Sequence, residues 1–315
     1  VLGNPDKALS EYVTDNAITN VADPSGAEEQ GLLPIGTYYV VPPIPTVGFV
    51  TAGIGHMTTL LDVDGAVRFE PLVLRYYNDY YPSMALQLAA KSLNLGVDDI
   101  KINLGEGVQL GGLTIRTDAS LLMNTFYYAG VQGKPAFSVD SFFDVIEGKI
   151  PANKYKDKIV LIGPTALGVG DSQKTPVSRD TAVVLLLAHT LSSILEEDFF
   201  VSPPWSHWAQ MGVTLLVILY LMLLLPRMRA GVAFVVSVVL LAILIGAHLG
   251  LMTTQRLWLQ LMLPAALLSL GHLLLTTKRF LMTERGKLES EAQSAESNRM
   301  LGLAYQGKGD LDQAF

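Results

Sequence analysis

Three long apolar runs follow one another toward the end of the chain, and they constrain its fold more than any other feature. They span residues 209–225, 230–252 and 257–277, and none of them contains Asp, Glu, Lys or Arg. A helix needs about 20 apolar residues to cross the hydrocarbon core of a bilayer. The sequence therefore predicts three transmembrane helices within residues 209–277, with lipid as their surroundings.

The basic residues that flank these runs set their direction. Arg227 and Arg229 follow the first run, Lys278 and Arg279 follow the third, and Arg256 alone follows the second. Basic flanks mark the cytoplasmic side of a membrane helix. We therefore expect a multi-pass protein with residues 1–208 outside the cytoplasm and the C-terminus inside.

Two histidines, His248 and His272, lie within the second and third runs. They are candidates for a proton relay or a polar contact between helices. The favoured interpretation is that His248, near the outer end of its helix, reaches the membrane interface, whereas His272 hydrogen-bonds a neighbouring helix. The runs hold no acidic or basic side chain, which argues against a pump or a channel.

The charge balance differs between the two parts of the chain. Residues 1–208 contain 13 Lys and Arg against 23 Asp and Glu, a net charge of −10, whereas residues 209–315 carry +3. An acidic domain is repelled by phosphate backbones and anionic surfaces, so we expect no nucleic-acid partner. The chain has no cysteine, which excludes Cys-based zinc sites and Cys nucleophiles.

Residues 1–208 alternate between strand-like and helix-like patterns, and this alternation is typical of a mixed α/β domain with a central sheet and flanking helices. Residues 183–188 form a further apolar run that leads into a helix through Leu195. The other predicted strands are Gly36–Val41, Ala66–Tyr76, Leu113–Arg116, Leu121–Tyr127 and a buried one at Lys158–Ile162, and the other helices are Tyr81–Leu95 and Val139–Ile150.

Short motifs recur through this domain in a fixed order. They are Pro42-Pro43-Ile44-Pro45, Gly55-His56, Asp64-Gly65-Ala66-Val67-Arg68, Tyr81-Pro82-Ser83, Gly148-Lys149-Ile150-Pro151, Lys158–Gly163, Gly170-Asp171, Thr175-Pro176 and Pro203-Pro204-Trp205. As an ordered set over about residues 40–280, they resemble the type-2 CHASE domain, a sensory extracellular domain associated with cyclases and histidine kinases. The resemblance also implies the three membrane helices that follow.

The chain departs from that family in two places. Residues 183–189 lack the Glu of the Gly-Val-Glu-x-His element, and no transmembrane helix precedes the domain. The chain also begins with Val and ends inside a helical pattern, so we expect a fragment of a longer protein.

A glycine-rich segment follows the predicted strand at Lys158–Ile162. Gly163 and Gly168 have the spacing of a phosphate loop, but Val169 stands where that loop needs Lys. The segment is therefore either a structural turn or a loop that borders a ligand cleft. The candidate ligand-lining residues are His56, Gly163, Thr165, Gly168, Gly170 and Asp171.

Other candidate sites are weaker. Asp62, Asp64 and Asp171 allow either a cation site or ordinary turns, and turns are favoured. His56, His189 and His207 lack metal-ligand spacing, and no GxSxG is present. We therefore expect no metal, no cofactor and no catalytic site in these residues.

The C-terminal segment is polar and helical in pattern. Residues 278–297 predict a cytoplasmic linker helix, and residues 298–315 match the start of a tetratricopeptide repeat at Leu301, Gly302, Tyr305, Gly309 and Ala314. One repeat cannot bury its own apolar face, so more repeats should follow.

These patterns together predict the sensory part of a receptor in a bacterial inner membrane. The outer domain would bind a small ligand or an envelope protein, and the repeats would lead to a cytoplasmic partner or output. By analogy of architecture the output is a Ser/Thr protein kinase, with a cyclase or histidine kinase less favoured. A scaffold that docks onto envelope complexes is the alternative, and a homo-oligomer is compatible with either.

Overall fold

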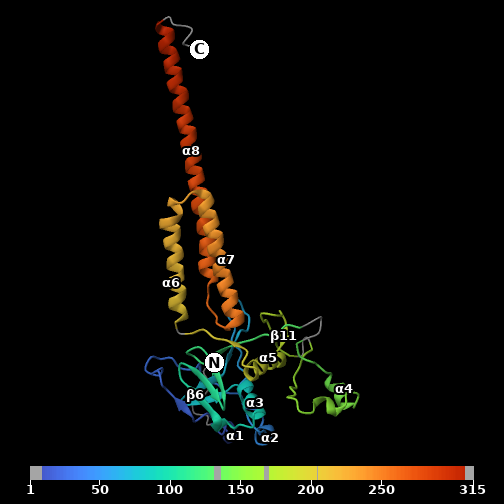
Figure 1. Cartoon of the computed structure of the whole chain (residues 1–315). Helices are drawn as coiled ribbons and strands as arrows, with labels where there is room; N and C mark the ends of the chain where they lie inside the picture. Colours follow the sequence, from blue (N-terminus) through green and yellow to red (C-terminus); the bar gives the residue numbers. More distant parts are fainter. Residues whose placement is uncertain (1–8, 131–135, 167–169, 204, 309–315) are drawn as a thin grey trace. The chain divides into compact units, whose positions relative to one another are not determined.

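A computed structural model describes residues 9–130, 136–166, 170–203 and 205–308. The chain forms two compact units, Val1–Pro204 with Met252–Trp258, and Trp205–Leu251 with Leu259–Phe315. The first unit holds the strands, and the second is built from helices (Figure 1).

The described residues of the first unit form four small sheets rather than the single central sheet that the sequence predicts. The largest has the strand order β1-β6-β7-β8, in which β1 pairs parallel with β6 and the other pairs are antiparallel. Its strands are β1 (Val21–Ala22), β6 (Ile100–Asn103), β7 (Gly107–Leu110) and β8 (Leu113–Arg116).

The predicted long strand Ala66–Tyr76 is divided, because the chain changes partners at Leu72. Before this residue β3 pairs with β9, and after it β4 pairs with β2 and β5. The resulting sheets have the orders β12-β9-β3 and β2-β4-β5, and a fourth sheet pairs β10 with β11. Their bounds are β2 (Gly36–Thr37), β3 (Phe69–Pro71), β4 (Val73–Tyr76), β5 (Asp79–Pro82), β9 (Leu122–Thr125), β10 (Ser172–Gln173), β11 (Thr181–Ala182) and β12 (Phe199–Phe200).

Two helices, α3 (Met84–Ser92) and α5 (Val183–Leu195), pack against each other over the main core. The Ser83 hydroxyl accepts the Leu86 N–H at 3.2 Å and so begins α3, later than the predicted Tyr81. Residues 183–188 belong to α5. The remaining helices are short: α1 (Glu11–Thr14), α2 (Pro45–Gly48), α4 (Phe142–Ile146), and the 3-10 turns η1 (Val97–Asp99) and η2 (Ala152–Tyr155).

The prediction of a buried strand at Lys158–Ile162 is wrong. These residues form no strand, and Ile159, Val160 and Ile162 are 44%, 50% and 75% exposed. No described strand pairs with the segment, so its backbone has no ladder to join and its apolar side chains remain outside the core.

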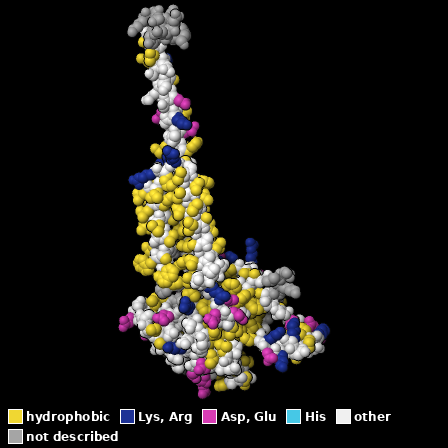
Figure 2. Space-filling model, viewed as in Figure 1, with side chains coloured by type: hydrophobic (Ala, Val, Ile, Leu, Met, Phe, Trp, Pro, Cys, Tyr) yellow, Lys and Arg dark blue, Asp and Glu magenta, His cyan; other side chains and the backbone are white. Residues whose placement is uncertain are grey.

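In the second unit, two helical segments are long and apolar enough to cross a membrane. The first runs from Ser206 to Arg227 through α6 (Ser206–Leu219), the π-turn η3 (Tyr220–Leu224) and the 3-10 turn η4 (Leu225–Arg227), and the second is α7 (Ala230–Thr254). Only 22% and 11% of their apolar windows are buried within the protein. Their side chains form a continuous apolar surface (Figure 2), as expected where lipid rather than protein is the neighbour.

The third apolar run does not form a separate spanning helix. Helix α8 begins only at Met262 and continues without a break to Lys308, so its apolar part leads directly into a polar part that extends past α6 and α7 (Figure 1). The predicted linker helix at 278–297 lies within α8. Residues 298–308 are helical as well, and the rest of the predicted repeat, including Gly309 and Ala314, lies outside the described residues.

A chain of polar contacts joins the helices of this unit. The Tyr220 and Ser237 hydroxyls lie 2.7 Å apart, and the Ser237 hydroxyl lies 2.8 Å from His272 Nδ1. The Arg279 guanidinium donates to the Met228 carbonyl at 2.9 Å. This bond brings Arg279 beside the loop that contains Arg227 and Arg229, so the basic flanks share one end of the unit. The prediction that His272 hydrogen-bonds a neighbouring helix is confirmed.

Candidate functional site

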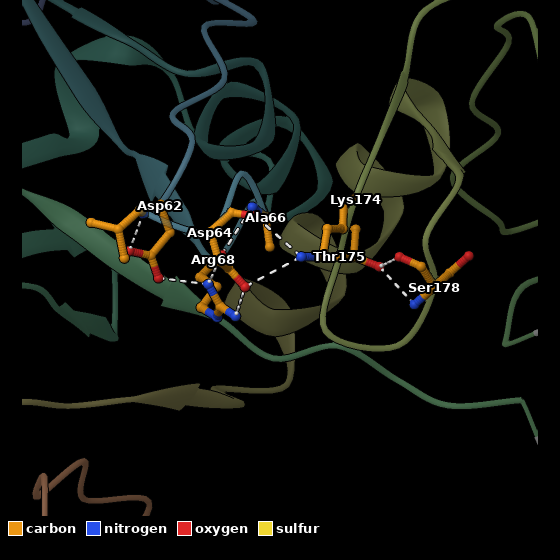
Figure 3. A network of polar contacts seen from close by, with 8 residues as sticks. Asp62, Asp64, Ala66, Arg68, Lys174, Thr175 and Ser178 are labelled. Atoms are coloured by element: carbon orange, nitrogen blue, oxygen red, sulfur yellow. Dashed lines mark hydrogen bonds and ion pairs between the residues drawn. The ribbon is translucent and has the colours of Figure 1, made fainter. Parts of the chain in front are cut away.

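The Asp-Gly-x-x-Arg motif forms a paired polar cluster at a turn before β3 (Figure 3). The Arg68 guanidinium donates to Asp62 at 2.6 Å, and to the two carboxylate oxygens of Asp64 at 2.6 and 2.9 Å. Lys174 adds a contact to Asp64 at 3.4 Å, and Lys174 itself forms a parallel β-bridge with Ala66. We call Asp62, Asp64, Arg68 and Lys174 the Arg68 cluster.

The Arg68 cluster serves structure rather than ligand binding. The Arg68 guanidinium holds the pKa of the Asp64 carboxyl well below its usual range. The cluster ties the turn to the hairpin of β10 and β11, whose own turn is held by the hydroxyls of Thr175, Thr181 and Ser178. Across the described ranges, no group of three His, Asp or Glu side chains is placed to hold a metal ion.

The glycine-rich segment lies elsewhere in the first unit. Gly163 and Thr165 are exposed, Gly170 is partly buried, and Asp171 is exposed; Gly168 falls outside the described residues. A Cβ added to Gly163 would lie 2.7 Å from the Val184 Cβ, so the segment passes close to α5. None of its described residues lines the cavity that contains His56 or the cavity that contains Lys91.

His56 lies in a cavity of about 430 Å³, which is separate from the glycine-rich segment. One wall comes from β4 and β5, where Leu74 is paired across the strands with Tyr81 and alternation brings Tyr76 to the same face. The opposite wall is the proline-rich segment Val40–Pro43, which is held because the Tyr12 hydroxyl donates to the Pro43 carbonyl at 2.9 Å. We call this space the His56 cavity.

Backbone pairing fixes His56 on the floor of this cavity. The His56 N–H donates to the Pro82 carbonyl at 3.0 Å, and the Met84 N–H donates to the His56 carbonyl at 2.8 Å. Gly55 makes this approach possible, because a Cβ there would lie 2.5 Å from the Met84 nitrogen. The Gly55-His56 and Tyr81-Pro82-Ser83 motifs therefore meet in space.

The lining of the His56 cavity is largely apolar and carries no charge among the described residues. Two polar atoms within it, His56 Nε2 and the Tyr81 hydroxyl, are buried and have no hydrogen-bond partner. Burial lowers the pKa of His56 to about 4 and raises the pKa of Tyr81 to about 12, so both side chains are neutral at ordinary pH. Unpaired buried polar atoms are rare in folded proteins.

A second cavity, of about 400 Å³, adjoins the first through Asn16, which lines both. Its lining includes the charged side chains Glu11, Asp15 and Lys91. The Asn16 side chain accepts from the Ile54 N–H at 2.9 Å and from Gln87 at 3.0 Å, so it forms a hydrogen-bonded partition. The two cavities thus differ in chemistry, one charged and one neutral.

Sequence reasoning identified His56 but missed Tyr81 and Glu70. The Tyr81-Pro82-Ser83 motif indicates only the start of a helix, and nothing in the sequence shows that Tyr81 lines the same cavity as His56. Burial raises the pKa of Glu70, on β3, to about 8. A Glu flanked by Phe69 and Pro71 was the available signal for that buried acid.

The fold is thus a mixed α/β unit with a neutral, largely apolar cavity, followed by two apolar helical segments among the described residues. The family model of the CHASE2 domain matches residues 3–225, and the chain belongs to that family. CHASE2 is a sensory extracytoplasmic domain of signalling receptors, and the two apolar helices indicate membrane anchoring after it. No curated protein and no solved structure matches the chain significantly.

Proposed function

We propose that this chain is the sensing and coupling part of a transmembrane receptor, and that α8 carries the signal to a cytoplasmic output. The observation that carries the proposal is the position of the segment between α7 and α8. Residues Met252–Trp258 belong to the first unit, together with the sensor domain, although they connect two helices of the second.

Specific contacts hold this connecting segment to the sensor domain. Val201, directly after β12, forms a parallel bridge with Leu257: its N–H donates to the Arg256 carbonyl at 2.9 Å, and the Trp258 N–H donates back to the Val201 carbonyl at 2.9 Å. Arg256 forms an ion pair with Asp198 and donates to the Glu197 carbonyl at 2.7 Å. These contacts also account for Arg256, the one basic flank on the outer side.

The route from this segment to the other end of α8 is short and continuous. Three residues separate Trp258 from Met262, where α8 begins, and the helix then runs to Lys308. A shift of β12 within the sensor domain is therefore transmitted to the start of a helix that leaves the apolar region. A rigid helix is a suitable element for carrying such a shift.

In this proposal the apolar residues at the start of α8 complete a third crossing, with residues 257–261 contributing at its outer edge. Arg227, Arg229, Lys278 and Arg279 then lie on the cytoplasmic side of a bacterial inner membrane, in accord with the positive-inside rule. The output beyond α8 is proposed to be a Ser/Thr protein kinase reached through tetratricopeptide repeats, on the strength of the helical residues 298–308 and of architecture alone.

The coupling is tested by loosening the Arg256 contacts in the whole chain, held in lipid nanodiscs. In the Arg256→Gln variant we expect faster amide exchange at Val201 and Leu257, and also in the first turns of α8 after Met262. Arg116→Gln, at an exposed position on β8 in the same unit, is the matched control and should change neither. Faster exchange confined to residues 198–258, with α8 unchanged, would overturn the coupling.

The topology is tested separately. Because the chain has no cysteine, single Cys variants report sidedness without background. Glu106→Cys and Gln255→Cys should react with a membrane-impermeant maleimide in intact cells, and Ser290→Cys only after permeabilisation. Labelling of Ser290→Cys in intact cells would contradict three crossings. A full reading frame without a kinase or cyclase after the repeats would contradict the output.

A further inference from the structure

The two unpaired polar atoms of the His56 cavity are the least explained feature of the sensor domain. Leaving a buried donor or acceptor without a partner destabilises a folded protein, because the group has lost its water and gained nothing in exchange. Such groups persist where function needs them. His56 and Tyr81, which carry these atoms, line the same cavity, so a molecule bound there is the candidate partner for both.

We propose that the His56 cavity is the sensing site, and that it binds an uncharged, largely apolar small molecule with a hydrogen-bond acceptor such as a carbonyl oxygen. This inference rests on the proposed receptor function only in treating the bound molecule as the signal. Binding of the molecule depends on the cavity alone.

The protonation of His56 identifies the kind of group that is needed. The Thr58 N–H donates to His56 Nδ1 at 3.4 Å, so Nδ1 is the unprotonated nitrogen and the proton of the neutral ring is on Nε2. Nε2 is therefore a buried donor on a residue that lines the cavity. The Tyr81 hydroxyl is also able to donate, so two buried donors have no hydrogen-bond acceptor.

The lining explains why the ligand is uncharged. No described lining residue carries a charge, so an ionised ligand would lose its water without gaining a counter-ion. Most of the rest of the lining is apolar, with contributions from Val13, Pro43, Ile54 and Leu74, and its other polar side chains are neutral. The neighbouring cavity, which contains Lys91, is the better place for an anion.

The dimensions and the entrance also fit a small molecule. The volume of about 430 Å³ lies within the range of known ligand pockets, roughly 300 to 1,000 Å³. Tyr39, Val41 and Met57 line the cavity and are 64%, 74% and 54% exposed, so its mouth is apolar and open to solvent. An apolar ligand has a direct path to His56.

The test uses benzophenone, an uncharged ketone that becomes photoreactive under ultraviolet light. The whole chain in nanodiscs is irradiated at increasing probe concentration, and the labelled peptides are identified by mass spectrometry. We expect saturable labelling of residues that line the His56 cavity, Met57 among them. The carboxylate analogue 4-benzoylbenzoate should need at least about tenfold more probe for half-saturation, because its charge finds no partner there.

Two substitutions remove the donors while keeping the rings, His56→Phe and Tyr81→Phe. Each should raise the benzophenone concentration for half-saturation by about three- to tenfold, the usual effect of one lost hydrogen bond. Tyr80→Phe is the matched control, since Tyr80 is the neighbour of Tyr81 on β5 but does not line the cavity. All variants are held in the same lipid, so the share of benzophenone that dissolves in the lipid is the same and cancels when variants are compared.

A water molecule held between the two side chains is the competing explanation, and the same variants exclude it or establish it. If a ligand is the missing partner, His56→Phe and Tyr81→Phe leave the Tm of the ligand-free protein unchanged or higher. A lower Tm in both variants, or labelling that does not saturate or lies outside the cavity, would overturn the proposal. Neither result changes the outcome expected for amide exchange in Arg256→Gln. The ligand proposal and the coupling proposal can therefore be contradicted separately.

Discussion

The Arg68 cluster and the His56 cavity lie in the same domain and handle polar groups in opposite ways. The side chains of Arg68 and Asp64 are about one-third or more exposed, and each has a partner. His56 Nε2 and the Tyr81 hydroxyl are fully buried, and neither has one. Pairing without burial stabilises a turn, whereas burial without pairing costs stability and prepares a place for something else.

Two carboxyl groups six residues apart in sequence show the same contrast in their pKa values. The Arg68 guanidinium lowers the pKa of Asp64, whereas burial raises the pKa of Glu70 to about 8 against the opposing effect of the Ser83 hydroxyl. Distance along the chain therefore says little about the surroundings of a charge. The partner and the degree of burial decide.

The largest effect is expected at Glu70. The folded protein holds the Glu70 proton up to about pH 8, whereas the unfolded chain releases it near 4.5, so stability falls as pH rises between these values. Glu70→Gln removes this loss and should stabilise the sensor domain by about 4–5 kcal/mol at pH 9, with little change at pH 4. Thermal melts of both proteins across this range, followed by near-UV circular dichroism, provide the measurement. A difference independent of pH would contradict a buried acid.

A somewhat smaller loss is expected when the wall of the His56 cavity is overfilled. In Gly55→Ala the added Cβ would meet the Met84 backbone at 2.5 Å, so the bridge between His56 and Ser83 must move. We expect a destabilisation of about 1–3 kcal/mol and loss of saturable benzophenone labelling. Gly112→Ala has open space around it and is the control. Equal melting temperatures for the two variants would show that the contact does not matter.

Loss of the pairing in the Arg68 cluster should matter less, because water screens it. Arg68→Met should lower the Tm by a few degrees at neutral pH, and less in high salt. The contribution of Asp64 is present above its unfolded pKa and is lost as pH falls, since its folded pKa is lowered. The two proteins should therefore converge in acid. Arg116→Met is the control, and benzophenone labelling should be unchanged in both variants.

The smallest effect on stability should come from the hydroxyl that has no partner. Tyr81→Phe removes an oxygen that forms no hydrogen bond, so the free energy of unfolding should change by no more than about 0.5 kcal/mol. The decisive comparison is between the stability losses of Tyr81→Phe and Arg68→Met. A larger loss in Tyr81→Phe than in Arg68→Met would reverse the contrast between the two regions.

The sequence predicted the local elements better than their assembly. Strand β8 lies at its predicted residues, and α3 lies close to its own, because apolar periodicity records which face each element buries. Helix α7 also lies close to its prediction, because an apolar run of this length forms a helix in a membrane. The buried strand at Lys158–Ile162 failed, because an apolar run does not say whether a neighbouring strand is available. The third membrane helix was not separable, because α8 continues across the change from apolar to polar residues.

The candidate site shows the same limit. His56 was identified from a motif, but its opposite wall comes from residues 40–43 and its second donor from β5, and only folding brings them together. The Asp-Gly-x-x-Arg turn was predicted correctly, because its partners are local in sequence. The glycine-rich segment remains a prediction as a ligand-lining loop.

Because α8 is one unbroken helix, the length of its polar part sets a direction as well as a distance. An α-helix of 47 residues is about 70 Å long, and each residue turns the chain by about 100°. Deleting one residue between Lys278 and Lys308 would therefore move whatever follows by only ~1.5 Å, yet point it in a different direction. The number of residues in this segment therefore sets the angle between the apolar part of α8 and whatever follows Lys308.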